Sequence, residues 1–188
     1  RFDPGMLYYA PQGWTSDDSD AIERLKIQYG TSLCYPISSM GSHVSVIPNH
    51  QVFRKTPLHT RANVAYFGTF GYELDLNSLK EEEIAEVKEQ IIFMKKYRKL
   101  FQFGDFYRLK SPFEGNETIW MVVSEDKKTA IVGYYRTLNG VNQAYSRIKL
   151  QGLDPDMLYE NILNKTENYG DELMNFGLIT TDVTAGEV

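Results

Sequence analysis

The chain has 188 residues, of which 42% are hydrophobic and 13% aromatic, so it can bury a core and does not belong to the disordered class. Its 25 acidic residues outnumber its 20 lysines and arginines, and the formal net charge of −5 argues against nucleic acid as the main partner. No apolar run approaches the roughly 20 residues that cross a bilayer, so we expect no membrane partner.

The residue types needed for disulfides and metal sites are scarce. Cys34 is the only cysteine, which excludes an intrachain disulfide and a cysteine metal cluster. A chain of this size without disulfides is typical of a reducing compartment, so we expect a cytoplasmic location. No His, Asp or Glu spacing is typical of a metal site, and we expect neither a metal nor a cofactor.

Short apolar runs and helical patterns alternate along the first hundred residues. A buried strand is predicted at Met6–Ala10 and a second one at Ser32–Tyr35. Between them, the polar run Ser16–Asp20 offers N-cap oxygens and negative charge for a helix over about residues 20–29.

The rest of this first part is expected to be a loop followed by two helices. The loop, rich in Ser, Gly and Pro, carries His43 and His50 and continues to about residue 57. Helices are predicted over residues 60–70 and 79–101, the second from its regular apolar spacing. The alternation of strand, loop and helix predicts an α/β fold with parallel strands.

The character of the sequence changes near residue 103, where β-rich runs separated by turns begin. Their regular spacing predicts an antiparallel sheet or sandwich. We therefore place a domain boundary here and expect domains at residues 1–102 and 103–188. The predicted strands cover residues 106–109, 119–123, 130–135, 145–150, 158–163 and 172–176.

The segment Trp14-Thr-Ser-Asp-Asp-Ser-Asp20 is the main candidate for chemistry. It places carboxylates after a predicted parallel strand, where barrel and doubly wound enzymes build their active sites. Glycoside hydrolysis needs two carboxyl groups, one of them protonated, and Trp14 offers a flat face for a sugar ring. Aspartates are also common helix N-caps, and Trp14 could simply belong to the core. Spacing alone does not choose among Asp17, Asp18 and Asp20.

Longer motifs resemble the family 36 glycoside hydrolases, and in particular their bacterial and fungal α-galactosidases. The similarity covers nearly the whole chain. Besides the Trp14–Asp20 segment, it is carried by Arg1-Phe-Asp-Pro-Gly-Met-Leu-Tyr-Tyr-Ala10, Ile27-Gln-Tyr-Gly-Thr-Ser-Leu33, Val46-Ile-Pro-Asn-His-Gln51, Phe103-Gly-Asp-Phe-Tyr-Arg-Leu109 and Gly170-Asp-Glu-Leu-Met-Asn175.

The resemblance implies an architecture and a mechanism. The chain would form the last part of a (β/α)8 TIM barrel, followed by a C-terminal antiparallel β-sandwich. The enzyme would remove terminal α-D-galactosyl residues from raffinose- and melibiose-type oligosaccharides with retention of configuration. In the family's Trp-Thr-Ser-Asp motif the aspartate is the general acid/base, which is Asp17 here. Asp18 and Asp20 would then be left for helix capping and local electrostatics, and Trp14 would lie near the sugar.

The sequence departs from the family pattern in one important way. The family's nucleophile is the aspartate of an earlier Lys-Trp-Asp motif, and that motif is absent from these residues. We therefore expect the upstream part of the enzyme as a partner, and this fragment alone to be inactive. The family commonly forms homotetramers, so a homo-oligomer is expected for the longer protein.

Two other functions fit the same residues. An enzyme on this scaffold could act on α-N-acetylgalactosaminides or transfer galactosyl units, because the carboxylates would be shared. Alternatively, the β-rich part could be a non-catalytic module that binds carbohydrate or packs against the enzyme. The second alternative predicts that replacing Asp17 has no kinetic effect.

Overall fold

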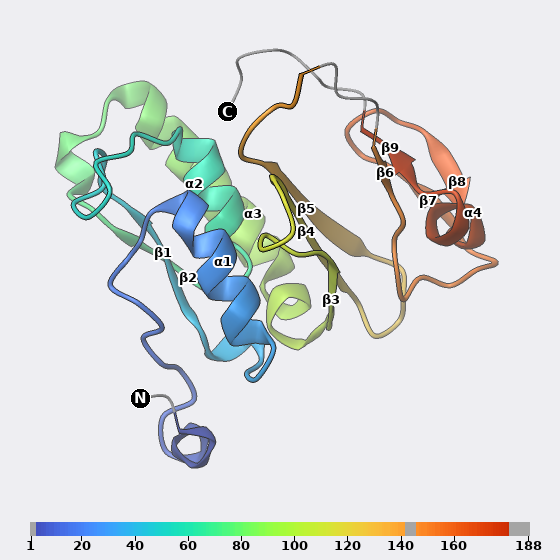
Figure 1. Ribbon diagram of the computed structural model, residues 1–188, viewed down its shortest axis with the longest axis horizontal. Helices are drawn as coiled ribbons and strands as arrows, with labels where there is room; N and C mark the ends of the chain where they lie inside the picture. Colours follow the sequence, from blue (N-terminus) through green and yellow to red (C-terminus); the bar gives the residue numbers. More distant parts are fainter. Residues whose placement is uncertain (1–2, 142–145, 181–188) are drawn as a thin grey trace. The chain divides into compact units, whose positions relative to one another are not determined.

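Parallel strand pairing organises the first part of the computed structural model, which describes residues 3–141 and 146–180 (Figure 1). Strand β1 (Gly41–Ser45) pairs in parallel with β2 (Thr69–Glu73). On the opposite edge of β1, Gly13 forms a parallel bridge with Met40, the residue just before the strand. Because parallel segments end at the same edge, the residues after Gly13, Ser45 and Glu73 begin on one side of this sheet.

A helix follows each of these parallel segments, and three short 3-10 turns complete the unit. The helices are α1 (Ala21–Ser32), α2 (Leu58–Ala65) and α3 (Glu81–Phe103). The 3-10 turns are η1 (Pro4–Tyr8), η2 (Ile37–Ser39) and η3 (Leu76–Ser78). The predicted alternation of strands and helices is confirmed, and the helices over residues 20–29 and 79–101 are close to α1 and α3.

Buried polar side chains join α1 to its neighbours. Gln28 is 2% exposed, and its Nε2 donates to the carbonyl oxygens of Val64 and Phe67, each at 3.1 Å. Its Oε1 accepts from the Ser42 hydroxyl of β1 at 2.9 Å. Each buried polar atom of the glutamine amide thus has a partner, so the contact fixes α1 without leaving an orphaned group.

Both predicted strands of the first part are wrong in position. Residues 4–8 form η1, because Asp3 caps the turn by accepting from the Gly5 N–H at 2.9 Å and Pro4 fixes the backbone. Residues 32–35 end α1 and form a turn, and the strand lies instead at Gly41–Ser45, inside the predicted loop. The helix predicted at 60–70 ends at Ala65, and β2 begins at Thr69.

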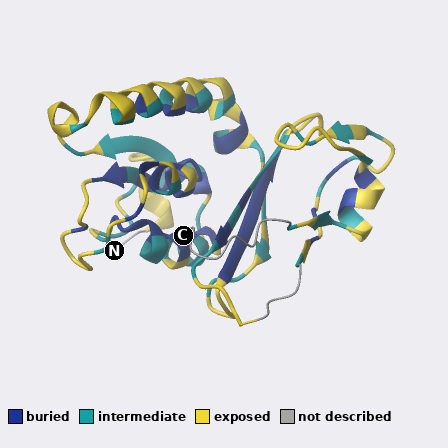
Figure 2. Ribbon diagram, turned by 90° about the horizontal axis from the view of Figure 1, so that it is seen from above, coloured by how far each residue is buried: buried dark blue, intermediate teal, exposed yellow. Residues whose placement is uncertain are grey.

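The chain divides into two units, residues 1–103 and 104–188, and the second is built on an antiparallel sheet. Its order is β3-β4-β5, with β4 in the centre and buried along its whole length (Figure 2). The strands predicted at 106–109, 119–123 and 130–135 are confirmed. They are β3 (Asp105–Lys110), β4 (Glu117–Val123) and β5 (Ala130–Arg136).

Shorter elements close the core of the second unit. Two antiparallel pairs, β6–β9 and β7–β8, lie beside helix α4 in Figure 1, and Leu173 of α4 packs in one cluster with Ile119 and Met121 of β4. The bounds are β6 (Arg147–Ile148), β7 (Leu158–Glu160), β8 (Glu167–Tyr169), α4 (Gly170–Asn175) and β9 (Leu178–Ile179).

The later strand predictions are less accurate. The strand predicted at 172–176 is wrong, because α4 occupies Gly170–Asn175. The Glu172 carboxylate accepts from the Tyr169 N–H at 2.9 Å and caps the start of that helix, and Gly177 ends it with a φ of +79°. The strand predicted at 158–163 is reduced to β7. The one predicted at 145–150 keeps only β6, with residue 145 lying outside the described residues.

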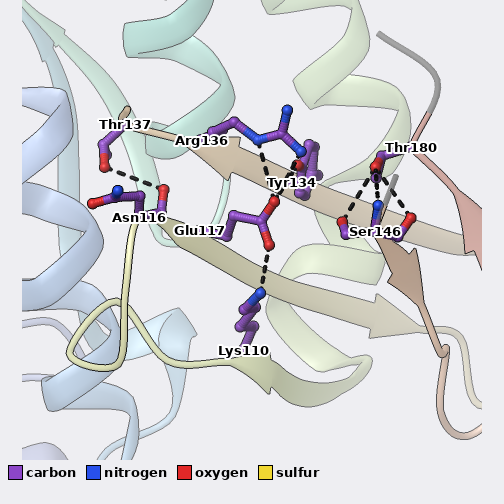
Figure 3. A network of polar contacts seen from close by, with 8 residues as sticks. All are labelled: Lys110, Asn116, Glu117, Tyr134, Arg136, Thr137, Ser146 and Thr180. Atoms are coloured by element: carbon purple, nitrogen blue, oxygen red, sulfur yellow. Dashed lines mark hydrogen bonds and ion pairs between the residues drawn. The ribbon is translucent and has the colours of Figure 1, made fainter. Parts of the chain in front are cut away.

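A network of charged and polar side chains lies across β3, β4 and β5 (Figure 3). Its centre is Glu117, which is 4% exposed and pairs with Lys110 and with Arg136 Nη2 at 2.9 Å. The Tyr134 hydroxyl also donates to Glu117, at 2.7 Å. Burial raises the pKa of Glu117, but the hydrogen bonds from Lys110, Tyr134 and Arg136 and the nearby Lys110 charge lower it to about 2.

Among residues 3–141 and 146–180, no helix is long and apolar enough to cross a membrane.

Candidate active site

Asp20 is the N-cap of α1. Its Oδ2 accepts from the Ile22 and Glu23 N–H groups, each at 3.1 Å, and it forms an ion pair with Arg54. The side chain is only 3% exposed. Capping satisfies backbone N–H donors that have no partner within the helix. Asp20 therefore has the structural role of a helix cap, one of the roles that the sequence left open for it.

Replacing Asp20 should therefore lower stability without removing chemistry. We expect Asp20→Ala to reduce the free energy of unfolding by about 1 to 2 kcal/mol, because the cap is lost. Asp20→Asn keeps a capping oxygen and should lose less. Chemical denaturation of both variants checks this. An Asp20→Asn variant that loses as much stability as Asp20→Ala would contradict the assignment.

Asp18 is also occupied by local backbone bonds. Its Oδ1 accepts from the Asp20 N–H at 2.9 Å, and its own N–H donates to the Ser16 hydroxyl at 3.0 Å. Such short-range bonds are the usual way in which Ser and Asp side chains fix the turn before a helix. Asp18 thus holds the geometry of the loop that leads into α1.

Asp17 differs from both neighbours because its side chain is exposed and takes no part in capping. Its Oδ1 accepts from the Trp14 indole Nε1–H at 2.8 Å. The loop that carries both residues begins at Gly13, at the carboxyl-terminal edge of the parallel segments. A carboxylate held from one side and open on the other can reach a molecule bound at that edge.

Trp14 stacks on His43, which lies in β1. Their ring centroids are 5.1 Å apart and the rings are inclined by 27°. Trp14 is 51% exposed, whereas His43 is half-buried. Burial lowers the pKa of His43, the Arg24 charge lowers it further, and Glu73 opposes them. This shift favours the neutral form of the imidazole.

The buried Arg24 side chain holds the loop that carries Trp14 and Asp17. Its Nη1 donates to Thr15 Oγ1 at 2.9 Å, and its Nη2 donates to the Gly41 carbonyl at 2.7 Å. The side chain is 4% exposed, and burial lowers the pKa of the guanidinium to about 10 although the Asp18 charge raises it. One buried arginine thus joins the loop after Gly13 to the start of β1.

The structure brings Asp17, Trp14 and His43 together. His50 does not take part in these contacts and is an exposed residue of the segment after β1. The sequence prediction placed His43 in a loop, so its contact with Trp14 was missed. No local sequence signal marks this contact, because Gly71 is seen to leave room for the His43 ring only once β1 and β2 are placed in register. Within the described residues, no group of His, Cys, Asp or Glu side chains could hold a metal ion.

Family models match both parts of the chain. The melibiase model matches residues 1–104, and a model described as the glycosyl hydrolase family 36 C-terminal domain matches residues 117–187. Alpha-galactosidase AgaA of Geobacillus stearothermophilus is 57% identical over 178 residues, which are 95% of this chain and 24% of that protein. Alpha-galactosidase Mel36A of Lactobacillus acidophilus is 49% identical over 177 residues, which are 94% of this chain and 24% of that protein.

Solved structures are similar over almost the whole chain. Crystalline AgaA matches with a TM-score of 0.94 and 55% identity, over 98% of this chain and 26% of that one. The α-galactosidase of Lactobacillus brevis matches with a TM-score of 0.95 and 52% identity, over 98% and 25%. Variants of AgaA have been crystallised with raffinose and with stachyose. The chain spans about a quarter of the length of the curated relatives it matches. It belongs to family 36 of the glycoside hydrolases, the family of these α-galactosidases.

Proposed function

We propose that this chain is the last part of a retaining α-galactosidase, and that Asp17 is the general acid/base of that enzyme. Residues 1–102 would complete a (β/α)8 barrel, and residues 103–188 would form a β-sandwich after it. The repeated order of parallel segment and helix supports the first assignment, and the antiparallel β3-β4-β5 sheet supports the second. The substrates would be terminal α-galactosides of the raffinose and melibiose type.

The reaction would proceed in two displacements. In the first, Asp17 gives its proton to the glycosidic oxygen while the nucleophilic carboxylate attacks the anomeric carbon, and the leaving alcohol departs. In the second, Asp17 takes a proton from water, the water oxygen attacks the anomeric carbon, and the bond from that carbon to the nucleophilic carboxylate breaks. Galactose leaves with its configuration retained. The proton on Asp17 is restored at the end of each cycle.

The contrast among three neighbouring aspartates carries this proposal. Asp18 and Asp20 accept backbone N–H bonds that form the start of α1, whereas Asp17 is exposed and, among the residues that the structure describes, accepts its hydrogen bond from the indole of Trp14. A general acid must reach the leaving oxygen directly, and Asp17 alone has that freedom. The exposed half of Trp14 would offer its apolar surface to the sugar beside this carboxylate.

The nucleophile would come from a part of the enzyme outside this chain, because these residues contain no Lys-Trp-Asp motif and match 24% of the length of AgaA. We therefore expect no detectable raffinose hydrolysis from the isolated 188-residue chain and turnover from the longest open reading frame that encodes it. Proton NMR of the first galactose released should show the α-anomer before mutarotation. Release of the β-anomer, or hydrolysis by the isolated chain, would refute the proposal.

The same assay separates the alternatives. A preference for α-N-acetylgalactosaminides, or more transfer to an acceptor sugar than to water, would indicate a related enzyme on this scaffold. A full-length protein that turns over no α-galactoside would favour a non-catalytic carbohydrate module. Homo-oligomer formation remains a prediction for the longer protein, and light scattering on that protein tests it.

A further inference from the structure

We propose that His43 is a positioning residue for the acid/base carboxylate and that it acts through Trp14. The inference rests on the proposed role of Asp17 and adds a residue that acts on this carboxylate through a second side chain. The contacts run from the sheet outward: His43 of β1 stacks on Trp14, and Trp14 donates a hydrogen bond to Asp17.

The bond from Trp14 makes the two oxygens of Asp17 unequal. An indole N–H is a donor and has no acceptor lone pair, so it cannot accept a proton from the carboxylic acid. In the protonated form of Asp17, Oδ1 must therefore remain the carbonyl oxygen that accepts from Trp14 Nε1 at 2.8 Å. The acid proton is then carried by Oδ2. The indole thus determines which oxygen faces the leaving group.

This selection works only if the indole ring stays in place. Trp14 lies in a loop and is 51% exposed, so the loop alone leaves much of its surface without contact. His43 supplies a flat partner, with ring centroids 5.1 Å apart and an angle of 27° between the planes. Because His43 belongs to β1, it ties the indole to the sheet and not to another part of the same loop.

The ring of His43 lies beside the backbone of two glycines. It lies opposite Gly71 in the β1–β2 register. A Cβ atom at Gly71 would lie 2.9 Å from His43 Cδ2, and one at Gly41 would lie 3.4 Å from His43 Cε1. Glycine at these positions leaves space that the imidazole occupies. A side chain at Gly71 would displace the ring from the position in which it stacks on Trp14.

The effect should depend on how much the leaving group needs a proton. His43→Ala in the full-length enzyme should lower kcat for raffinose by roughly 10- to 100-fold with little change in KM, because a loosened carboxylate is misplaced for proton transfer. A nitrophenyl α-galactoside, whose leaving group needs little protonation, should be affected far less. His43→Phe keeps a flat ring against Trp14 and should recover most of the raffinose activity.

A double-mutant cycle isolates the path through Asp17. In an Asp17→Ala background, His43→Ala should cause no further loss on raffinose, because the group it positions is gone. Trp14→Phe keeps the stacked ring but removes the N–H, and it should show the same selective loss and the same dependence on Asp17. His59→Ala, an exposed histidine on α2, is the matched control and should leave both substrates unchanged.

The outcomes separate this inference from the proposed function. If Asp17→Ala itself spares raffinose, the assignment of the acid/base fails. If Asp17→Ala is selective but His43→Ala slows both substrates equally, or still costs activity in the Asp17→Ala background, His43 is only a packing residue and the inference is overturned. If His43→Ala does not fold, His43→Leu takes its place in the same cycle. A silent Trp14→Phe variant overturns the inference in either case, because the indole N–H through which His43 acts would then contribute nothing.

Discussion

Replacing Asp17 with alanine in the full-length enzyme is expected to lower raffinose turnover by roughly 10²- to 10⁴-fold, the usual contribution of general acid–base catalysis. The loss should be far smaller in the first half-reaction of a nitrophenyl α-galactoside, because nitrophenolate leaves without a proton. Hydrolysis of the covalent intermediate lacks its base in the same variant, so the nitrophenyl reaction should show a burst of nitrophenol followed by a slow steady state. Stopped-flow absorbance on that substrate and sugar analysis on raffinose measure both effects.

Azide and a neighbouring aspartate provide the controls for this prediction. A small anion needs no general base, so azide should speed the second step in Asp17→Ala and yield a galactosyl azide of α-configuration, the anomer that a second inverting displacement gives. Asp18→Asn keeps the oxygen that accepts from the Asp20 N–H and should leave the ratio of the two substrates near the wild-type value. If Asp17→Ala turned over both substrates at the wild-type rates, Asp17 would be an exposed loop residue without a catalytic role. That result would favour the hypothesis of a non-catalytic module.

The start of α1 could be predicted because its causes are local. Ser16, Asp18 and Asp20 all lie within a few residues of the backbone N–H groups that they bond, and capping chemistry of this range is visible in the order of the residues. What the order of residues did not reveal was which aspartate remained free. That required the family motif, and the contact between Trp14 and Asp17 is consistent with it.

The position of β1 could not be predicted for the opposite reason. Its sequence, Gly-Ser-His-Val-Ser, has one large apolar residue and resembles a loop. It is buried because distant residues surround it: Arg24 and Gln28 of α1 bond Gly41 and Ser42. A local pattern contains no information on such distant partners, whereas the continuous apolar run from Ile119 to Val123 predicts β4 by itself.

Helix α4 shows the same limit in the second unit. Its six residues are too few to show a 3.6-residue apolar pattern, and the sequence therefore predicts a strand at this position. The Glu172 cap at its start and the positive φ of Gly177 at its end are the local causes of the helix. An acidic residue at the start and a glycine after the end of the segment indicate a helix better than its apolar spacing does.

Glu117→Gln is expected to destabilise the second unit by about 3 kcal/mol at pH 7, because it leaves the Arg136 guanidinium, whose side chain is 9% exposed, without its counter-charge. Lys110 should matter less, since its side chain is 43% exposed and water can replace the pair. Hydrogen exchange of peptides that cover β4 and β5 measures the change. Glu125→Gln, in the exposed turn between these strands, is the matched control and should leave exchange unaltered.

The stabilisation by Glu117 should decrease as the pH falls. The pKa of Glu117 is about 2 in the folded protein against an ordinary value of 4.5, so the unfolded chain binds the proton more readily. The stabilisation is therefore complete above pH 4.5 and is lost as the pH falls from 4.5 towards 2. The thermal midpoints of the wild type and of Glu117→Gln should differ most at neutral pH and converge on acidification, with Glu125→Gln following the wild type throughout. A gap that stays constant from pH 7 to pH 2.5 would mean that the amide disturbs packing and that the charge of Glu117 contributes nothing to the stability of the sheet.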